Sequence, residues 1–70
     1  MPMDTEAESA IRDAFRDPPP HNVRTIPGRA TEILNDPQRG SDRIYEEIAE
    51  MVKSGKIIAP AEPWKDWHLT

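Results

Sequence analysis

The sequence predicts one small, mainly α-helical domain of two or three helices, with a proline-rich linker and an extended C-terminal tail for which disorder is one alternative. Three observations lead to this prediction. The chain has only 70 residues, enough for a single domain. Two segments repeat their apolar residues with the period of an α-helix. Leu, Ile, Val and Phe supply only 12 of the residues, while eight are proline, so any core is small.

The first helix is expected over residues 5–16. Thr5 and Glu8 have the spacing of a capping box, in which each side chain accepts a hydrogen bond from a backbone N–H left free by the helix. Pro18 and the two prolines after it end the helix. The apolar stripe has the spacing of one helix face and comprises Ala7, Ala10, Ile11, Ala14 and Phe15.

Residues 17–28 are expected to form an extended linker. Its three consecutive prolines favour a stiff polyproline II segment, and Pro27-Gly28 is typical of a turn. A short helix is an option over residues 29–35, because its apolar side chains fall on one side and Asp36-Pro37 would end it.

Residues 42–54 carry the strongest helix pattern. Ser41 is a suitable N-cap, acidic residues fill the N-terminal half, and Gly55 suits the left-handed position that ends a helix. The apolar stripe of this main helix comprises Ile44, Tyr45, Ile48, Met51 and Val52.

The tail, residues 56–70, holds both tryptophans. It begins with a short apolar run that would need a neighbouring strand, and the rest of the chain offers no clear one. We therefore expect an extended segment packed on the main helix. Trp64 and Trp67 are flanked by prolines and charges. Either ring can complete the core or face a partner, and one inside with one outside is among the alternatives.

Composition argues against several functions. The chain has no cysteine, and its two histidines are far apart in sequence, so no metal or cofactor site is predicted. No nucleophile–base set and no glycine-rich phosphate loop is present, so we expect no enzyme. No apolar run approaches the roughly 20 residues of a membrane span. The first residues, 1–6, lack the order of a secretory signal, and a cytoplasmic location is expected.

Residues 44–58, IYEEIAEMVKSGKII, resemble the opening helix of GntR-type winged-helix repressors. They are also similar to the sigma-binding helices of flagellar-type anti-sigma factors, which continue through Ser-Gly into an extended tail. The first resemblance implies a helix-turn-helix and wing further along, whereas this chain ends 12 residues later. Both resemblances are confined to this segment, and no family or binding site is assigned from them.

We expect a small acidic, non-enzymatic regulatory protein that binds a larger protein machine and inhibits or modulates it. The formal net charge of −4 at pH 7 suits a basic surface. RNA polymerase or a sigma factor is the preferred partner, since both have basic surfaces that hold nucleic acid. Small acidic proteins of bacteria and their viruses, which this chain resembles in size and composition, often act as such inhibitors.

Three kinds of side chain are predicted to bind the partner. Aromatic anchors would supply apolar burial, carboxylates would supply charge complementarity, and an apolar stripe would supply packing. A pair of linker arginines could clamp an acidic surface. The predicted residues are Trp64 and Trp67; Glu46, Glu47 and Glu50; Ile44, Ile48 and Met51; and Arg24 and Arg29.

Two other classes of function remain open. The short helix, a loop and the main helix superficially resemble a helix-turn-helix, which would fit a small DNA-binding regulator. Acidic side chains on the second helix would be repelled by phosphates, so direct nucleic-acid binding is disfavoured. The third class is a structural subunit whose apolar stripe self-associates, which keeps a homo-oligomer open as an alternative.

Overall fold

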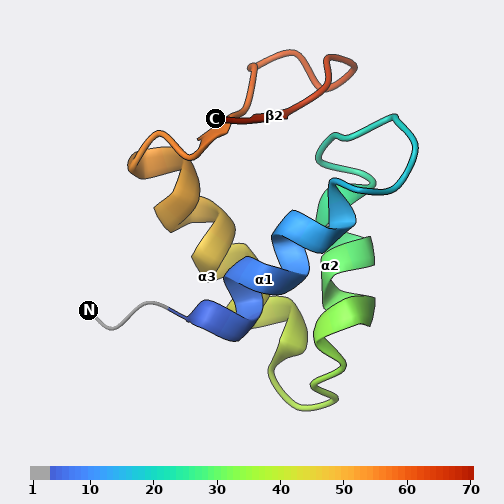
Figure 1. The fold of residues 1–70 in the computed structure, drawn as a ribbon, viewed down its shortest axis with the longest axis vertical. Coiled ribbons are helices and arrows are strands. Elements are labelled where there is room, and N and C mark those ends of the chain that lie inside the picture. Colours follow the sequence, from blue (N-terminus) through green and yellow to red (C-terminus); the bar gives the residue numbers. More distant parts are fainter. Residues whose placement is uncertain (1–3) are drawn as a thin grey trace.

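The computed structural model describes residues 4–70 and consists of three helices followed by two short strands (Figure 1). The elements are α1 (Thr5–Ala14), α2 (Ile26–Leu34), α3 (Gly40–Lys53), β1 (Ile57–Ile58) and β2 (His68–Leu69). The strands pair antiparallel, with Ile57 opposite Leu69. α1 packs against both other helices, and the two-stranded sheet lies beyond the C-terminal end of α3. The prediction of a small, mainly α-helical domain is confirmed.

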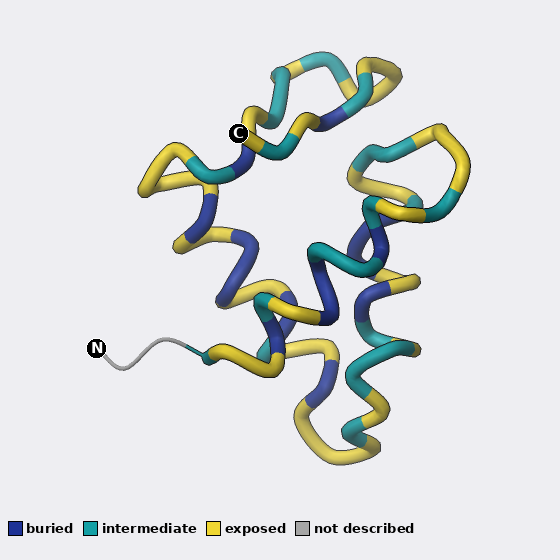
Figure 2. Tube along the Cα trace, viewed as in Figure 1, coloured by how far each residue is buried: buried dark blue, intermediate teal, exposed yellow. Residues whose placement is uncertain are grey.

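The core lies where the three helices meet, and Figure 2 shows their buried residues turned toward one another. α1 contributes three alanines and Ile11, so its predicted apolar face is the buried one. Because alanine side chains are short, α1 can approach its neighbours closely. The largest fully buried side chains are Ile11, Ile26, Ile44, Met51 and Ile57.

Asp4, not Thr5, is the N-cap of α1. Its Oδ1 accepts a hydrogen bond from the Ala7 backbone N–H at 3.1 Å. The predicted capping box between Thr5 and Glu8 does not form, because Thr5 already lies inside the helix. The helix also ends at Ala14, two residues earlier than expected, and turns follow it.

α2 begins at Ile26, three residues earlier than expected. Pro27 lies in its first turn, where the missing N–H of proline removes no helical hydrogen bond. The linker is correspondingly shorter, and it turns back on itself through bends and turns instead of running straight. The Thr25 hydroxyl fastens this segment, since it donates to the Pro20 carbonyl and accepts from the Asn22 backbone N–H, both at 2.8 Å.

α3 begins at Gly40, so Ser41 lies within the helix and is not its cap. The turn before α3 is held by Asp36, whose Oδ1 accepts hydrogen bonds from the backbone N–H groups of Gln38 and Arg39 at 3.0 and 3.1 Å. No side chain caps α3, and Asp36 instead orders the turn that leads into the helix.

The C-terminal tail is ordered and makes contacts far back in the sequence. β2 is the partner strand that β1 requires. The Trp67 backbone N–H donates to the His21 carbonyl at 2.6 Å, and the Asp66 carboxylate accepts from the His21 backbone N–H at 3.3 Å. The expected extended tail is thus corrected to a loop closed by a small sheet and tied to the linker.

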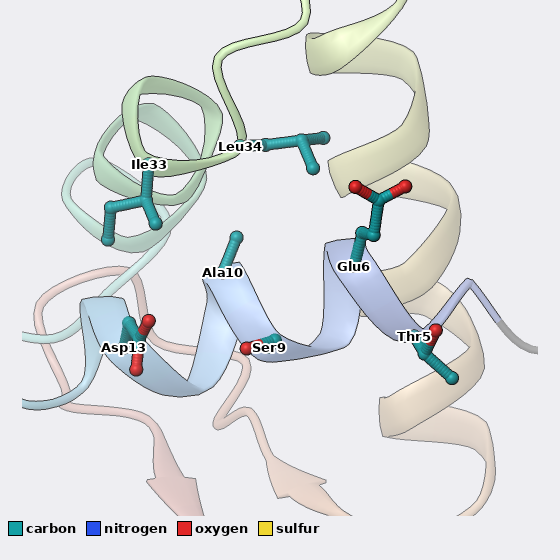
Figure 3. A pocket seen from close by; sticks show the side chains of 7 residues that line it. All are labelled: Thr5, Glu6, Ser9, Ala10, Asp13, Ile33 and Leu34. Atoms are coloured by element: carbon teal, nitrogen blue, oxygen red, sulfur yellow. The ribbon is translucent and has the colours of Figure 1, made fainter.

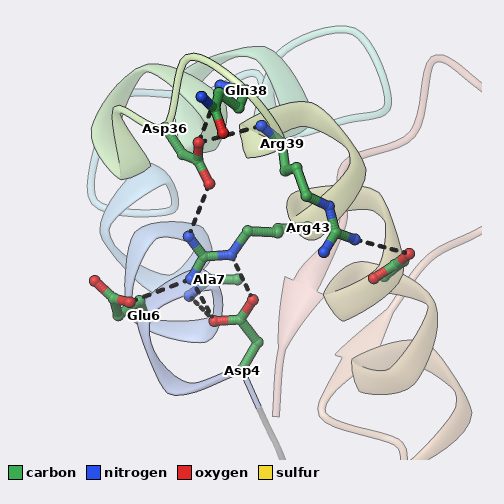
Figure 4. A network of polar contacts seen from close by, with 8 residues as sticks. Asp4, Glu6, Ala7, Asp36, Gln38, Arg39 and Arg43 are labelled. Atoms are coloured by element: carbon green, nitrogen blue, oxygen red, sulfur yellow. Dashed lines mark hydrogen bonds and ion pairs between the residues drawn. The ribbon is translucent and has the colours of Figure 1, made fainter.

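One cation joins the beginnings of two helices (Figure 4). Arg43 of α3 donates from Nε and Nη2 to the two carboxylate oxygens of Asp4, at 2.8 and 2.9 Å. Its Nη1 donates to Asp36 at 3.1 Å, and Nη2 also reaches Glu6 at 3.3 Å. The Arg43 side chain is only 22 % exposed, so solvent screens these pairs less than it would on an open surface.

This network shifts the pKa values of its members. The hydrogen bonds from Arg43 lower the pKa of Asp4 from its ordinary 3.8 to about 2. Backbone N–H donors and Arg43 also lower the pKa of Asp36. The carboxylates raise the pKa of Arg43, so the guanidinium is charged at any pH at which the chain folds.

We expect Arg43→Ala to reduce the free energy of unfolding by clearly more than the loss of an ordinary exposed ion pair would, because it leaves Asp4 and Asp36 close together without a shared cation. Arg43→Lys keeps the charge but loses the two-pronged contact with Asp4, so it should cost about half as much. Urea denaturation followed by circular dichroism measures both losses. A loss below about 0.5 kcal/mol for Arg43→Ala, typical of an exposed pair, would contradict the role given to the network.

Candidate functional site

Trp64 is the most exposed large apolar side chain described, with 74 % of its surface accessible. It lies in the loop between β1 and β2. The Lys65 backbone N–H donates to the Glu62 carbonyl at 3.1 Å, which closes a turn over residues 62–65. Pro63 occupies the second position of this turn, which proline favours. The indole is therefore displayed on a defined turn.

Trp67, three residues after Trp64, has its side chain buried instead of exposed. It is only 9 % exposed and belongs to the core cluster. Its backbone bond to His21 and the pairing of Ile57 with Leu69 hold the loop at its base. Of the alternatives left open by the sequence, the structure shows one tryptophan inside and one outside.

The loop is closed a second time at its end. The Thr70 backbone N–H donates to the Lys56 carbonyl at 3.0 Å, and the Thr70 hydroxyl donates to the Gly55 carbonyl at 2.7 Å. On the outer side of the sheet, Ile58 and His68 are opposite each other and both are exposed. The loop that presents Trp64 is thus fixed at both of its ends.

Several residues predicted to bind a partner are buried. Ile44, Ile48 and Met51 form the face of α3 that packs into the core, so the prediction that they contact a partner is corrected. Glu47 is 6 % exposed, since it lies on the same inward face of α3 and points toward α1. Glu46 and Glu50 are exposed, together with Asp42 one turn before Glu46.

The two linker arginines are exposed and lie at different places. Arg29, in α2, forms an ion pair with Asp17 through Nε at 2.8 Å. Arg24 lies in the turn before α2, where its backbone N–H donates to the Asn22 side chain at 2.8 Å. Because Arg29 already pairs within the chain, it is less suited to clamp a partner than the sequence predicted.

Glu47 is the one buried carboxylate among the described residues. Burial, followed by the nearby negative charges of Glu8 and Asp4, raises its pKa, whereas the Asp4 backbone N–H and Lys56 oppose that shift. Glu8, its neighbour, has its pKa lowered by a hydrogen bond from Arg12. The interface between α1 and α3 therefore holds two carboxylates, one with a raised pKa and one with a lowered pKa.

A shallow, open groove of about 360 Å³ lies between α1 and the C-terminal end of α2 (Figure 3). Ala10, Ile33 and Leu34 give it an apolar floor, and the remaining lining residues come from the exposed side of α1: Thr5, Glu6, Ser9 and Asp13. This groove was not predicted from the sequence, because it depends on how α1 and α2 pack against each other. The one signal of the groove in the sequence is a pair of acidic residues, Glu6 and Asp13, two helical turns apart on either side of Ser9 and Ala10.

No protein-family model, no curated protein and no solved structure matches this chain. Within residues 4–70, no group of three or more histidine or acidic side chains is arranged to hold a metal ion. Each helix in the same part of the chain is too short or too polar to cross a bilayer. The described features most suited to contact another molecule are the exposed Trp64 and the groove.

The two tryptophans should differ in both fluorescence and stability. In a Trp67→Phe variant, we expect acrylamide to quench Trp64 readily, whereas in Trp64→Phe the remaining Trp67 should be protected. Trp67→Ala should reduce the free energy of unfolding by about 3 kcal/mol, because it opens a cavity at the base of the loop. Trp64→Ala should change it by less than about 0.5 kcal/mol. Equal quenching of Trp64 and Trp67 would contradict the prediction that the loop buries one ring and exposes the other.

Stability should have its maximum at mildly acidic pH. The raised pKa of Glu47 means that its favourable contribution is complete below its ordinary value of 4.5 and is lost as pH rises through the raised value. Asp4 acts in the opposite sense, because its contribution is present above 3.8 and is lost as pH falls toward 2.

The variant that isolates the first effect is Glu47→Gln, which keeps an oxygen to accept from the Asp4 N–H. It should abolish the decline in stability that occurs as the pH rises from the maximum toward neutral, and leave the decline at lower pH unchanged. Urea denaturation at a series of pH values tests this. A neutral-side decline that persists in the variant would show that another group causes it.

Proposed function

We propose that this chain is a non-enzymatic protein-binding module and that Trp64 is its anchor. The observation that carries the proposal is an indole with 74 % of its surface exposed on a turn that is fixed by hydrogen bonds. Tryptophan is enriched among the residues that contribute most to protein interfaces, since it brings a large apolar area with few rotamers to restrict.

The ordered loop strengthens this proposal. A flexible tail would lose conformational entropy on binding, whereas a loop already closed by β1, β2 and the contact between Trp67 and His21 has lost most of it on folding. While the Trp64 ring is exposed to water, it contributes no apolar burial to the fold of this chain. It is therefore well suited to enter an apolar pocket on another protein at low additional cost.

The charge pattern favours a partner with a basic surface. The net charge is −4, and α3 exposes Asp42, Glu46 and Glu50 along one side. Surfaces that normally hold nucleic acid have the complementary charge. For this reason RNA polymerase and sigma factors, in the cytoplasm, are the first targets that we propose, and inhibition or modulation by occupying such a surface is the proposed mode of action.

The order of elements supports a second candidate, DNA binding. α2, the turn that follows it and α3 have the order of a helix-turn-helix, in which the second helix is the recognition helix. Architecture alone does not assign a function. The acidic exposed side of α3 would repel phosphates, so we place this candidate second.

The test compares three forms of the immobilised chain: wild type, Trp64→Ala and Val23→Ala. Val23 is also exposed, at 46 %, but lies in the turn before α2, so it is the matched apolar control. Purified RNA polymerase core and sigma factor from the native host are the first probes, and host lysate is the second. We expect Trp64→Ala to weaken partner binding by about thirtyfold, as for an interface anchor, and Val23→Ala to have little effect.

Three outcomes would overturn parts of the proposal. Equal affinity of wild type and Trp64→Ala for the captured partner would remove Trp64 as the anchor. If binding depends on Trp64 but the partner is unrelated to transcription, the proposal of a binding module stands and the proposed target is refuted. Salt-sensitive binding to a random DNA duplex, without a protein partner, would favour the second candidate.

A further inference from the structure

The groove between α1 and α2 combines an apolar floor with acidic ends. Ala10 is buried, while Ile33 and Leu34 are partly buried and border the core. Figure 3 shows Ala10 directed from α1 toward the end of α2 that carries these two residues. Glu6 and Asp13 lie seven residues apart on α1, which corresponds to about 10 Å along the helix axis.

The two carboxylates keep much of their capacity to bind a cation. The Glu6 side chain is 79 % exposed, and its ion pair is with Arg43 at 3.3 Å, a cation that makes shorter contacts with Asp4 and Asp36. Asp13 pairs with Arg16 at 3.8 Å, where the Arg16 side chain is 84 % exposed and the Asp13 side chain 43 %. Such exposed pairs contribute little and exchange readily. None of the lining residues is basic.

We propose that this groove is a second protein-binding site and that it receives a basic amphipathic helix of a partner. Two helices border the groove, and a third helix can lie along it with its apolar face on the partly exposed Ile33 and Leu34. Two arginines or lysines two helical turns apart on that partner helix would then reach Glu6 and Asp13, since the spacings match. This site is independent of Trp64 and of the function proposed for it.

The test uses a designed helical peptide with two arginines two turns apart and a pair of leucines between them. Binding to the full chain is measured by isothermal titration and mapped by amide chemical shifts. We expect the largest shifts at Ser9, Ala10, Ile33 and Leu34. The double variant Glu6→Gln/Asp13→Asn should weaken binding by about tenfold, and Glu32→Gln, an exposed acid of α2 outside the groove, should leave it unchanged.

A second variant guards against an indirect effect through the Arg43 network. Asp13→Asn alone touches only the exposed pair with Arg16, so the fold is retained, and it should weaken binding by about threefold. A peptide with serines in place of the leucines should not bind. Absence of binding by the leucine peptide, equal binding of the serine peptide, or shifts centred on Trp64 would each overturn the proposed groove site.

Discussion

The contact of Arg43 with Asp4 and Asp36 joins the first turn of α1 and the turn before α3 to α3 itself. The face that α1 turns to the core consists of three alanines and one isoleucine. Short side chains allow the helices to approach closely. They interlock little with their neighbours, so they do not fix the rotation of α1 about its own axis. The guanidinium has a planar, directional set of donors, and two of them engage Asp4, which also caps α1. We infer that this polar contact sets the register that the alanine face leaves undefined.

The helices themselves were largely predictable, because local signals and the apolar period agree. The stripe of α1 and that of α3 are the buried faces, and Pro37 lies between α2 and α3 as expected. The errors lie at the helix ends. Local preference favours Thr5 and Ser41 as caps, whereas Asp4, whose carboxylate is held by Arg43 of α3, caps α1, and no side chain caps α3. A contact 39 residues apart leaves no local trace in the sequence.

The candidate sites were predicted less well, for the same physical reason. Trp64 and Trp67 have nearly the same neighbourhood in sequence, and long-range contacts such as the backbone bond from Trp67 to His21 separate their environments. Glu47 belongs by spacing to the inward face of α3, next to Ile44 and Ile48, yet its charge suggested an outward position. The helical period was the better guide. The groove depends on how α1 meets α2, which composition and periodicity do not specify.

The position of Trp64 bears on function because apolar side chains are scarce in this chain. The core is small for a chain of 70 residues without disulfides, and such a core gains from each ring it buries. Trp67, three residues away, is buried, and the turn closed by Glu62 and Lys65 holds Trp64 outside. Folding thus leaves one of the two largest apolar side chains in the sequence outside the core. A binding role gives that surface a use, because a partner supplies the burial that the chain's own core does not.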